Sequence, residues 1–247
     1  MSSLNNSVLD SLKGDVKRYL PLHSTYQQQS LTDRIRRSIS WLERALEVSS
    51  GSTPTRFLDL WISLNALYGQ RPYNRQQSSH GKRDYGNSDF KFLLKQLRRL
   101  DHSCSELFPL MKRVEKESRI LVENKFLYKG FWKEDLDDFK LEFSRASDQL
   151  QRSLGNRNPV EYFGILFQRL RILRNQIAHG SSSVNTKKSQ DALMPGLKIL
   201  EEMIPIFVRL MITKGMELDW PEIPYPGRDT PQHPRGAFQT KNKINIL

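Results

Sequence analysis

The feature that most constrains this chain is a helical repeat of apolar residues that runs through most of its length. After Ser30, apolar side chains recur at intervals of three and four residues, which places them along one face of an amphipathic helix. They are Leu31, Ile35, Ile39, Leu42 and Leu46. Gly51 ends this segment, and Pro54 is suited to the start of the next helix. No alternating strand pattern competes, so we expect an all-α bundle.

A long polar segment separates the second expected helix from the third. Residues 57–68 are apolar on most sides, so this helix should be central, and Gly69 is a natural end for it. Residues 69–88 hold glycine, proline, amides and several basic side chains but hardly any apolar ones, which indicates a long polar loop. Ser88 is suited to cap a helix that begins at Phe90.

The second half of the chain is also expected to be helical. Helices are predicted near 103–123, at 135–154 and after Asn185, the last with Pro195 and Pro205 as candidate kinks. Trp61 and Trp132 are expected in the core. We therefore predict one helical domain over residues 1–219, with its core in about 30–215, and an extended proline-rich tail over 220–247.

The helix with the clearest boundaries is predicted between Asn158 and His179. Asn158 is a favourable N-cap, Pro159 takes the first helical position, and Gly180 supplies the stop. Arg174 and His179 lie on this helix with four residues between them. The spacing alone says little, because three other arginine–histidine pairs share it, but those pairs lie around a proline, in the polar loop and in the tail. Only a capped helix fixes side-chain geometry well enough for chemistry.

A helical wheel divides the polar residues of this helix between two faces. At about 100° per residue, Arg174 falls on the apolar stripe and so needs a carboxylate partner or a groove to face. Arg171, Asn175 and His179 form a separate row. Arg174 and His179 therefore meet only at a groove edge, through a loosened last turn or at a second subunit. The structural alternative is a basic helix end that complements the helix dipole.

The stretch from Tyr162 to Gly180, with its motif Arg174-Asn-Gln-Ile-Ala-His179, resembles the signature helix of HEPN domains. In these domains an arginine is followed by a polar residue and, a few positions later, by a histidine. The segments 57–69 and 197–207 are similar to neighbouring helices of bacterial members. The resemblance covers roughly residues 30–215 and implies an antiparallel helical bundle that dimerises, so that two motif helices form a composite cleft.

The resemblance also implies a function, that of a metal-independent endoribonuclease acting on RNA as a homodimer. Such proteins serve as toxins or antiviral defence effectors, restrained by an antitoxin or another regulatory partner. His179 would take part in proton transfer, Arg174 would bind the scissile phosphate, and Asn175 would orient the histidine or the substrate. Arg171 and Asn65 are candidates for RNA binding or support, although Asn65 is equally interpreted as a satisfied core amide.

One departure from the family bears on regulation. Toxins of this family that are silenced by nucleotidyl transfer carry a tyrosine two residues after the histidine, and this chain has Ser181 there. Control by that route is therefore not expected. The competing class of function is a non-catalytic helical module that binds RNA or dimerises and keeps the motif helix for that purpose.

Composition narrows the remaining choices. The chain has 39 Lys and Arg against 27 Asp and Glu, a net charge of +12, which favours polyanionic partners such as RNA, with a solubilising surface charge as the alternative. A single cysteine, Cys104, excludes an internal disulfide, and no phosphate loop or metal-ligand spacing occurs, so we expect no cofactor and no metal. We see neither a signal peptide nor a membrane-spanning run, and expect a cytoplasmic protein.

Overall fold

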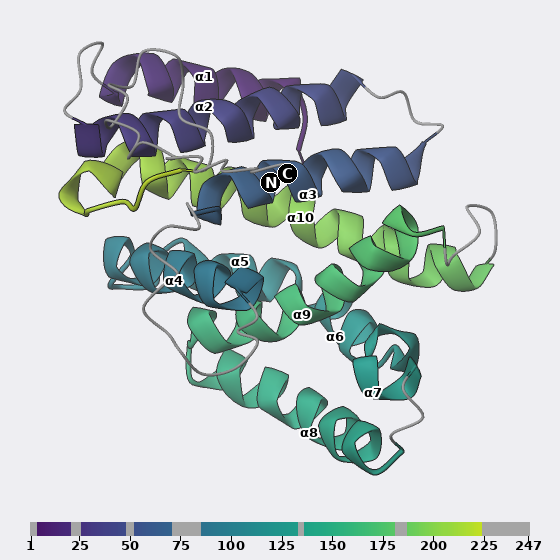
Figure 1. The fold of residues 1–247 in the computed structure, drawn as a ribbon. Coiled ribbons are helices and arrows are strands. Elements are labelled where there is room, and N and C mark those ends of the chain that lie inside the picture. Colours follow the sequence, from purple (N-terminus) through teal and green to yellow (C-terminus); the bar gives the residue numbers. More distant parts are fainter. Residues whose placement is uncertain are drawn as a thin grey trace, which may run out of the picture.

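The fold is entirely helical in the part of the chain that the structure, a computed structural model, describes. That part comprises residues 4–20, 26–47, 52–70, 85–132, 136–180 and 187–223. It contains ten α-helices and no strand, so the all-α prediction is confirmed (Figure 1). The helices are α1 (Asn6–Tyr19), α2 (Tyr26–Glu47), α3 (Thr53–Tyr68), α4 (Tyr85–Leu100), α5 (Leu107–Arg113), α6 (Glu115–Val122), α7 (Lys129–Trp132), α8 (Leu136–Gly155), α9 (Pro159–Ala178) and α10 (Lys187–Lys214).

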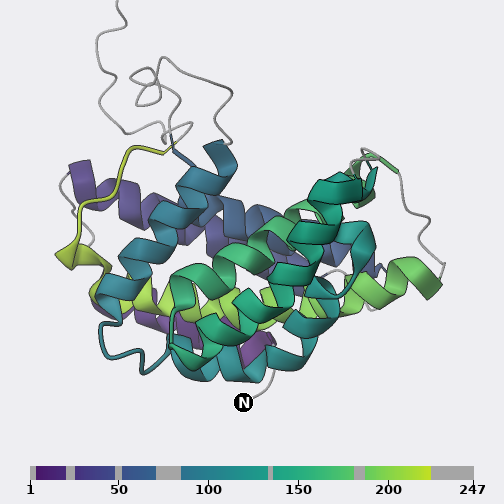
Figure 2. The same ribbon diagram turned by 90° about the horizontal axis from the view of Figure 1, so that it is seen from below.

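The long helix α10 is the centre around which the others are arranged. It contacts α1 to α6 and α9. Figure 1 shows α1, α2 and α3 on one side of α10 and α4, α9 and α8 on the other. The view from below shows α9 crossing between α4 and α8, both of which it contacts (Figure 2). The motif helix is therefore held on two sides by neighbouring helices.

The apolar stripes predicted from the sequence face this core. Leu31, Ile35 and Leu42 of α2 are fully buried, as expected from their spacing. Helix α10 continues through Pro195 and Pro205 without ending. At Gly196 of α10 an added Cβ would lie 2.9 Å from Leu173 Cδ2, so the missing side chain allows α10 to approach α9 closely.

Aromatic rings join α3, α4 and α9. Phe167 of α9 stacks on Phe90 with ring centroids 4.1 Å apart and on Trp61 at 5.4 Å, and it meets the edge of Tyr68 at 5.5 Å. Offset-stacked and edge-to-face pairs at these distances are the favoured geometries. These contacts fix the rotation of α9 about its axis, and so decide which of its residues face inward.

A buried arginine of α2 links the end of α3 to the segment that follows α10. Arg34 of α2 donates from Nη1 to the carbonyl oxygens of Leu67 (3.0 Å) and Gly69 (2.7 Å), and from Nη2 to that of Pro221 (2.7 Å). Burial is the main cause that lowers the pKa of Arg34 to about 10. Residues 220–223, placed in the tail by the sequence, lie on the bundle, where Trp220 is buried and donates from Nε1 to the carbonyl of Gly215 at 2.8 Å.

Several element boundaries differ from those expected. Helix α4 begins at Tyr85 rather than at Phe90, inside the predicted polar loop. The helix expected at 103–123 is divided into α5 and α6 at Val114. Asp101 caps the start of α5, because its carboxylate accepts from the backbone N–H groups of Ser105, Glu106 and Leu107.

The expectation that Trp132 lies in the core is wrong. Its side chain is 60% exposed at the end of α7, and its indole N–H donates to the carbonyl of Phe126 at 2.9 Å. Trp61, by contrast, is buried as expected. Local sequence places a tryptophan on a helix but does not determine what packs above it.

Candidate functional site

The motif helix α9 has the boundaries that its sequence predicts. The Asn158 side chain accepts from the Glu161 N–H at 3.3 Å and donates to the Glu161 carboxylate at 3.2 Å. At the other end the His179 N–H donates to the carbonyl of Asn175 at 2.9 Å, and Gly180 adopts a φ of 66°. Because that φ lies in the left-handed region, glycine is the favoured residue at this stop.

Arg174 lies on an aromatic ring. Its guanidinium carbon is 5.4 Å from the centroid of the Trp61 ring, within the range of a cation–π contact. The side chain is half-buried, and its Nε is buried without a hydrogen-bond partner among the described residues. No described carboxylate forms an ion pair with it. The position of Arg174 on the apolar stripe is therefore explained by an aromatic neighbour and not by a buried salt bridge.

Asn175 and Arg171 line a small cleft on a different face of α9. Both side chains are half-buried, and the cleft has a volume of about 110 Å³. Lys129 at the start of α7 lies on its opposite wall. Of the three residues predicted to form a separate row, Arg171 and Asn175 thus line one cleft, whereas His179 does not line it.

Arg169 supports this cleft and was not singled out from the sequence. It is buried and donates from Nη1 to the Leu127 carbonyl at 2.9 Å and from Nη2 to Glu142 Oε1 at 2.6 Å. Its guanidinium carbon lies 3.5 Å from the Tyr128 ring centroid. Burial raises the pKa of the Tyr128 hydroxyl, and the charge of Arg169 opposes that rise.

Gln176 makes a second connection between α9 and the same segment. Its side-chain amide donates to the carbonyl of Phe126 at 2.8 Å. Together with Arg169 it holds residues 126–128 against the C-terminal half of α9. Two residues in the second half of α9, Arg169 and Gln176, thus hold the neighbouring segment in place. Two others, Arg171 and Asn175, line the cleft.

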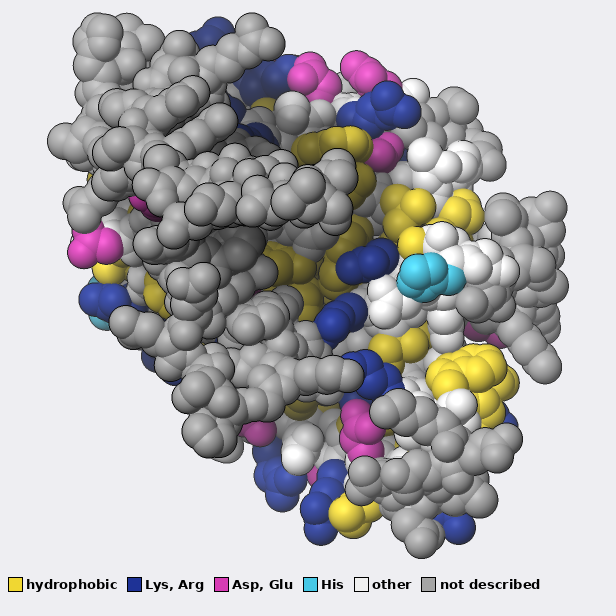
Figure 3. Space-filling view, in the orientation of Figure 1, with side chains coloured by type: hydrophobic (Ala, Val, Ile, Leu, Met, Phe, Trp, Pro, Cys, Tyr) yellow, Lys and Arg dark blue, Asp and Glu magenta, His cyan; other side chains and the backbone are white. Residues whose placement is uncertain are grey.

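His179 is the C-cap of α9, and its side chain is exposed. It forms no hydrogen bond or ion pair with any described residue. The last turn of α9 keeps its regular hydrogen bonding, so Arg174 and His179 stay about 140° apart around the helix axis. The loosened last turn that would bring them together is not observed. Figure 3 shows a row of Lys and Arg side chains beside a histidine on the face where α9 ends.

Asn65 lies on α3, half-buried, and its side-chain oxygen accepts from the hydroxyl of Tyr68. No hydrogen bond within the described residues joins it to Arg174 or His179. Asn65 thus has a local hydrogen bond within α3, and its supporting role stays a prediction.

Part of the cleft could have been found in the sequence. Glu161, Gly164, Gln168, Arg171 and Asn175 recur at intervals of three and four residues, a polar and small-residue row along α9. Asn87, which lies across from Gln168, could not be found in this way because its segment reads as a loop.

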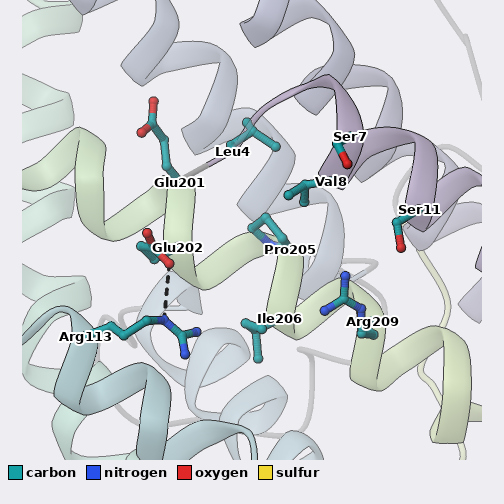
Figure 4. Close-up of a pocket in the computed structure, with 10 residues that line it drawn as sticks. All are labelled: Leu4, Ser7, Val8, Ser11, Arg113, Glu201, Glu202, Pro205, Ile206 and Arg209. Atoms are coloured by element: carbon teal, nitrogen blue, oxygen red, sulfur yellow. Dashed lines mark hydrogen bonds and ion pairs between the residues drawn. The ribbon is translucent and has the colours of Figure 1, made fainter. Parts of the chain in front are cut away.

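A second hollow, of about 300 Å³, lies between α1 and α10, away from the end of α9 (Figure 4). Its charged residues largely satisfy one another. Figure 4 shows Glu202 directed at Arg113, with an N–O distance of 3.3 Å, and Glu202 also pairs with Lys198 at 2.7 Å. Glu201 pairs with Arg56 at 2.7 Å, and burial raises the pKa of the Glu201 carboxyl. The carboxylates that line it make it a poor site for an anion.

The described residues hold no cluster of His, Cys, Asp or Glu suited to a metal ion, and none of their helices combines the length and hydropathy of a membrane span. Ser181, residues 71–84 of the predicted loop and the tail from 224 onward lie outside the described part. No protein family model, no curated protein and no solved structure matches this chain.

Proposed function

We propose that this chain is a metal-independent endoribonuclease of HEPN type, with Arg174, Asn175 and His179 as its working residues. The observation that carries the proposal is the end of α9. There an arginine that pairs with no described carboxylate lies within one and a half turns of an exposed histidine whose side chain forms no hydrogen bond or ion pair with a described residue. The resemblance of the motif and the net charge of +12 add support.

Each residue has the chemistry its role requires. A guanidinium without a carboxylate partner keeps its charge and donors for the scissile phosphate, and stacking on Trp61 restricts its movement. An exposed imidazole can accept a proton from the ribose 2′-hydroxyl or donate one to the leaving oxygen. Asn175, next to Arg174 and one turn before His179, can orient either the histidine or the substrate.

The regular last turn favours a composite site. Arg174 and His179 diverge around the axis of a single α9, so one helix does not place both on the same phosphate. A homodimer in which two α9 ends meet brings Arg174 of one copy to His179 of the other. We therefore include a dimer in the proposal, with a twofold axis near the end of α9.

The direct test is RNA cleavage in excess EDTA. We expect the wild type to cut RNA, and His179→Ala and Arg174→Ala to lose the activity while keeping the fold. His102→Ala and Arg99→Ala are matched controls, since both change exposed residues at the end of α4. Full cleavage by both α9 variants would refute the proposal. RNA binding without cleavage by the wild type would favour the non-catalytic module.

The cellular part of the proposal is a toxin or antiviral effector that acts in the cytoplasm and is restrained by an antitoxin or another regulatory partner. Its test is induced expression in bacteria. We expect the wild type to arrest growth and His179→Ala, expressed at the same level, to leave growth unaffected. Arrest by both proteins would show that toxicity does not depend on the proposed chemistry.

A further inference from the structure

A groove made of two adjoining hollows runs along α9 and ends at Asn175 of the candidate site. Its wider part has a volume of about 780 Å³ and lies between the start of α4 and the first half of α9. Its narrower part is the cleft of about 110 Å³ that Asn175 lines. Asn87 and Gln168 line both parts, so the two adjoin. The groove follows α9 from Asn158 to Asn175, most of a helix about 30 Å long.

Gly164 lies in the middle of this groove and keeps it open. A Cβ placed there would meet no atom within 4 Å. Glycine in the interior of a helix is unfavourable, and no close approach of a neighbouring element requires it at this position. The missing side chain therefore serves to widen the groove rather than to pack the core, in contrast to Gly196.

The lining of the groove changes from one end to the other. The end near Asn175 carries Lys129 and Arg171, and the one carboxylate among its described lining residues, Glu142, pairs with Arg169. Among the described residues, the wider end has one charge of each sign, Lys91 and Glu161. Apolar side chains and side-chain amides alternate along the length, contributed by Val160, Ile165 and Ile172 and by Asn87, Gln168 and Asn175.

We propose that this groove along α9, opened by Gly164, is where an unpaired RNA strand binds on its way to the end of α9. Cations suit phosphates, apolar side chains suit the faces of bases, and amides suit the Watson–Crick edges of bases, which are free only in an unpaired strand. The inference rests on the proposed function, because it names the form of RNA that reaches the same site.

The test is binding of RNA that cannot be cleaved. The probe is a labelled 2′-O-methyl RNA of mixed sequence and about 12 nucleotides, alone or annealed to its complement, measured by fluorescence anisotropy. We expect the wild type to bind the single strand more tightly than the duplex. Gly164→Leu, which fills the groove, should weaken single-strand binding about tenfold, as expected for the loss of one base contact.

Matched variants separate the groove from general effects. Gly14→Leu is the control, because Gly14 is also inside a helix, α1, and also has nothing within 4 Å of its Cβ position. Gln168→Glu adds a negative charge to the groove and should weaken binding, whereas Gln151→Glu on α8 should not. Both glycine variants replace glycine with a better helix former, so both should fold.

Three outcomes overturn the inference, and all are distinct from failure of the proposed function. Equal binding by Gly164→Leu and Gly14→Leu, or equal affinity for duplex and single strand, would show that the groove does not hold the strand. A change of oligomeric state in Gly164→Leu with unchanged RNA affinity would assign the groove to a protein contact instead. Because the probe cannot be cut, binding without any cleavage of ordinary RNA would refute the nuclease and leave the groove.

Discussion

Arg174 and Trp61 form a cation–π pair that joins the motif helix to α3, with the guanidinium carbon 5.4 Å from the ring centroid. The pair lets a charged side chain occupy the apolar stripe of α9 without a carboxylate that would compete with phosphate. The Trp61 ring should therefore contribute to activity as well as to the core.

Replacing Trp61 should reduce activity by more than its effect on the fold explains. Trp61→Leu removes the ring beneath Arg174 and should lower the free energy of unfolding by about 2–4 kcal/mol, because Trp61 is buried. RNA cleavage should fall about tenfold at a temperature where the variant is folded. Trp61→Phe keeps an aromatic face and should recover most of the activity. Equal activity of the two variants would argue against the ring as an orienting contact.

Mixing two inactive variants should restore activity if the site is shared between copies. In a mixture of Arg174→Ala and His179→Ala, about half of the dimers contain one of each, and such a dimer has one intact composite site. Activity should therefore rise to about a quarter of the wild-type value after the subunits exchange. A mixture that stays as inactive as its components would place both residues in one subunit. Light scattering provides the accompanying measurement of dimer formation.

Replacement by leucine should change the free energy of unfolding in opposite directions at Gly164 and at Gly196. Gly164→Leu should raise the free energy of unfolding by about 0.5–1 kcal/mol, since leucine is the better helix former and the space is empty. Gly196→Leu should lower it by about 1–3 kcal/mol, because Leu173, Phe57 and Leu170 lie within 3.3 Å of the added Cβ. Urea unfolding of both variants beside the wild type measures the difference. Destabilisation by Gly164→Leu would mean that the groove is occupied by this chain.

Glu201 should make a recognisable contribution to the pH dependence of stability. Burial raises its pKa in the folded protein above the value in the unfolded chain, so the unfolded chain releases this proton first. The protonated Glu201 carboxyl therefore stabilises the folded protein below about pH 4.5, and this contribution is lost as the pH rises through the raised pKa. The Glu201→Gln side chain does not titrate, so the variant does not lose this contribution. The difference in free energy of unfolding, variant minus wild type, should therefore be larger at about pH 7 than at about pH 4. A constant difference in denaturant unfolding would contradict the expectation.

Local rules predicted the elements better than their environments. The stripe of α2 and the caps of α9 depend on neighbours within a few residues, and both are as the sequence indicates. The start of α4 was missed because Tyr85-Gly-Asn-Ser has the composition of a loop, although α4, which contacts α9, begins there. Neither the exposure of Trp132 nor the ring beneath Arg174 is a local property.

In the candidate site too, helix geometry was predicted from the sequence, whereas the contacts with distant segments were not. The wheel correctly placed Arg174 apart from the row of Arg171 and Asn175, because that separation follows from helix geometry alone. The partners came from distant segments: Trp61 from α3, Lys129 from α7 and Asn87 from α4. One sequence alone does not show which residues of such distant segments lie side by side.

The contacts of Arg34 have a consequence for how this protein is synthesised. Two of its carbonyl acceptors come from the end of α3, but the third, at Pro221, is 187 residues further along the chain than Arg34 itself. During translation α2 and α3 emerge long before that acceptor exists, and α10, which contacts both, is also absent. A nascent chain therefore cannot complete the packing of α2 against α3 and α10 until α10 and Pro221 have left the ribosome.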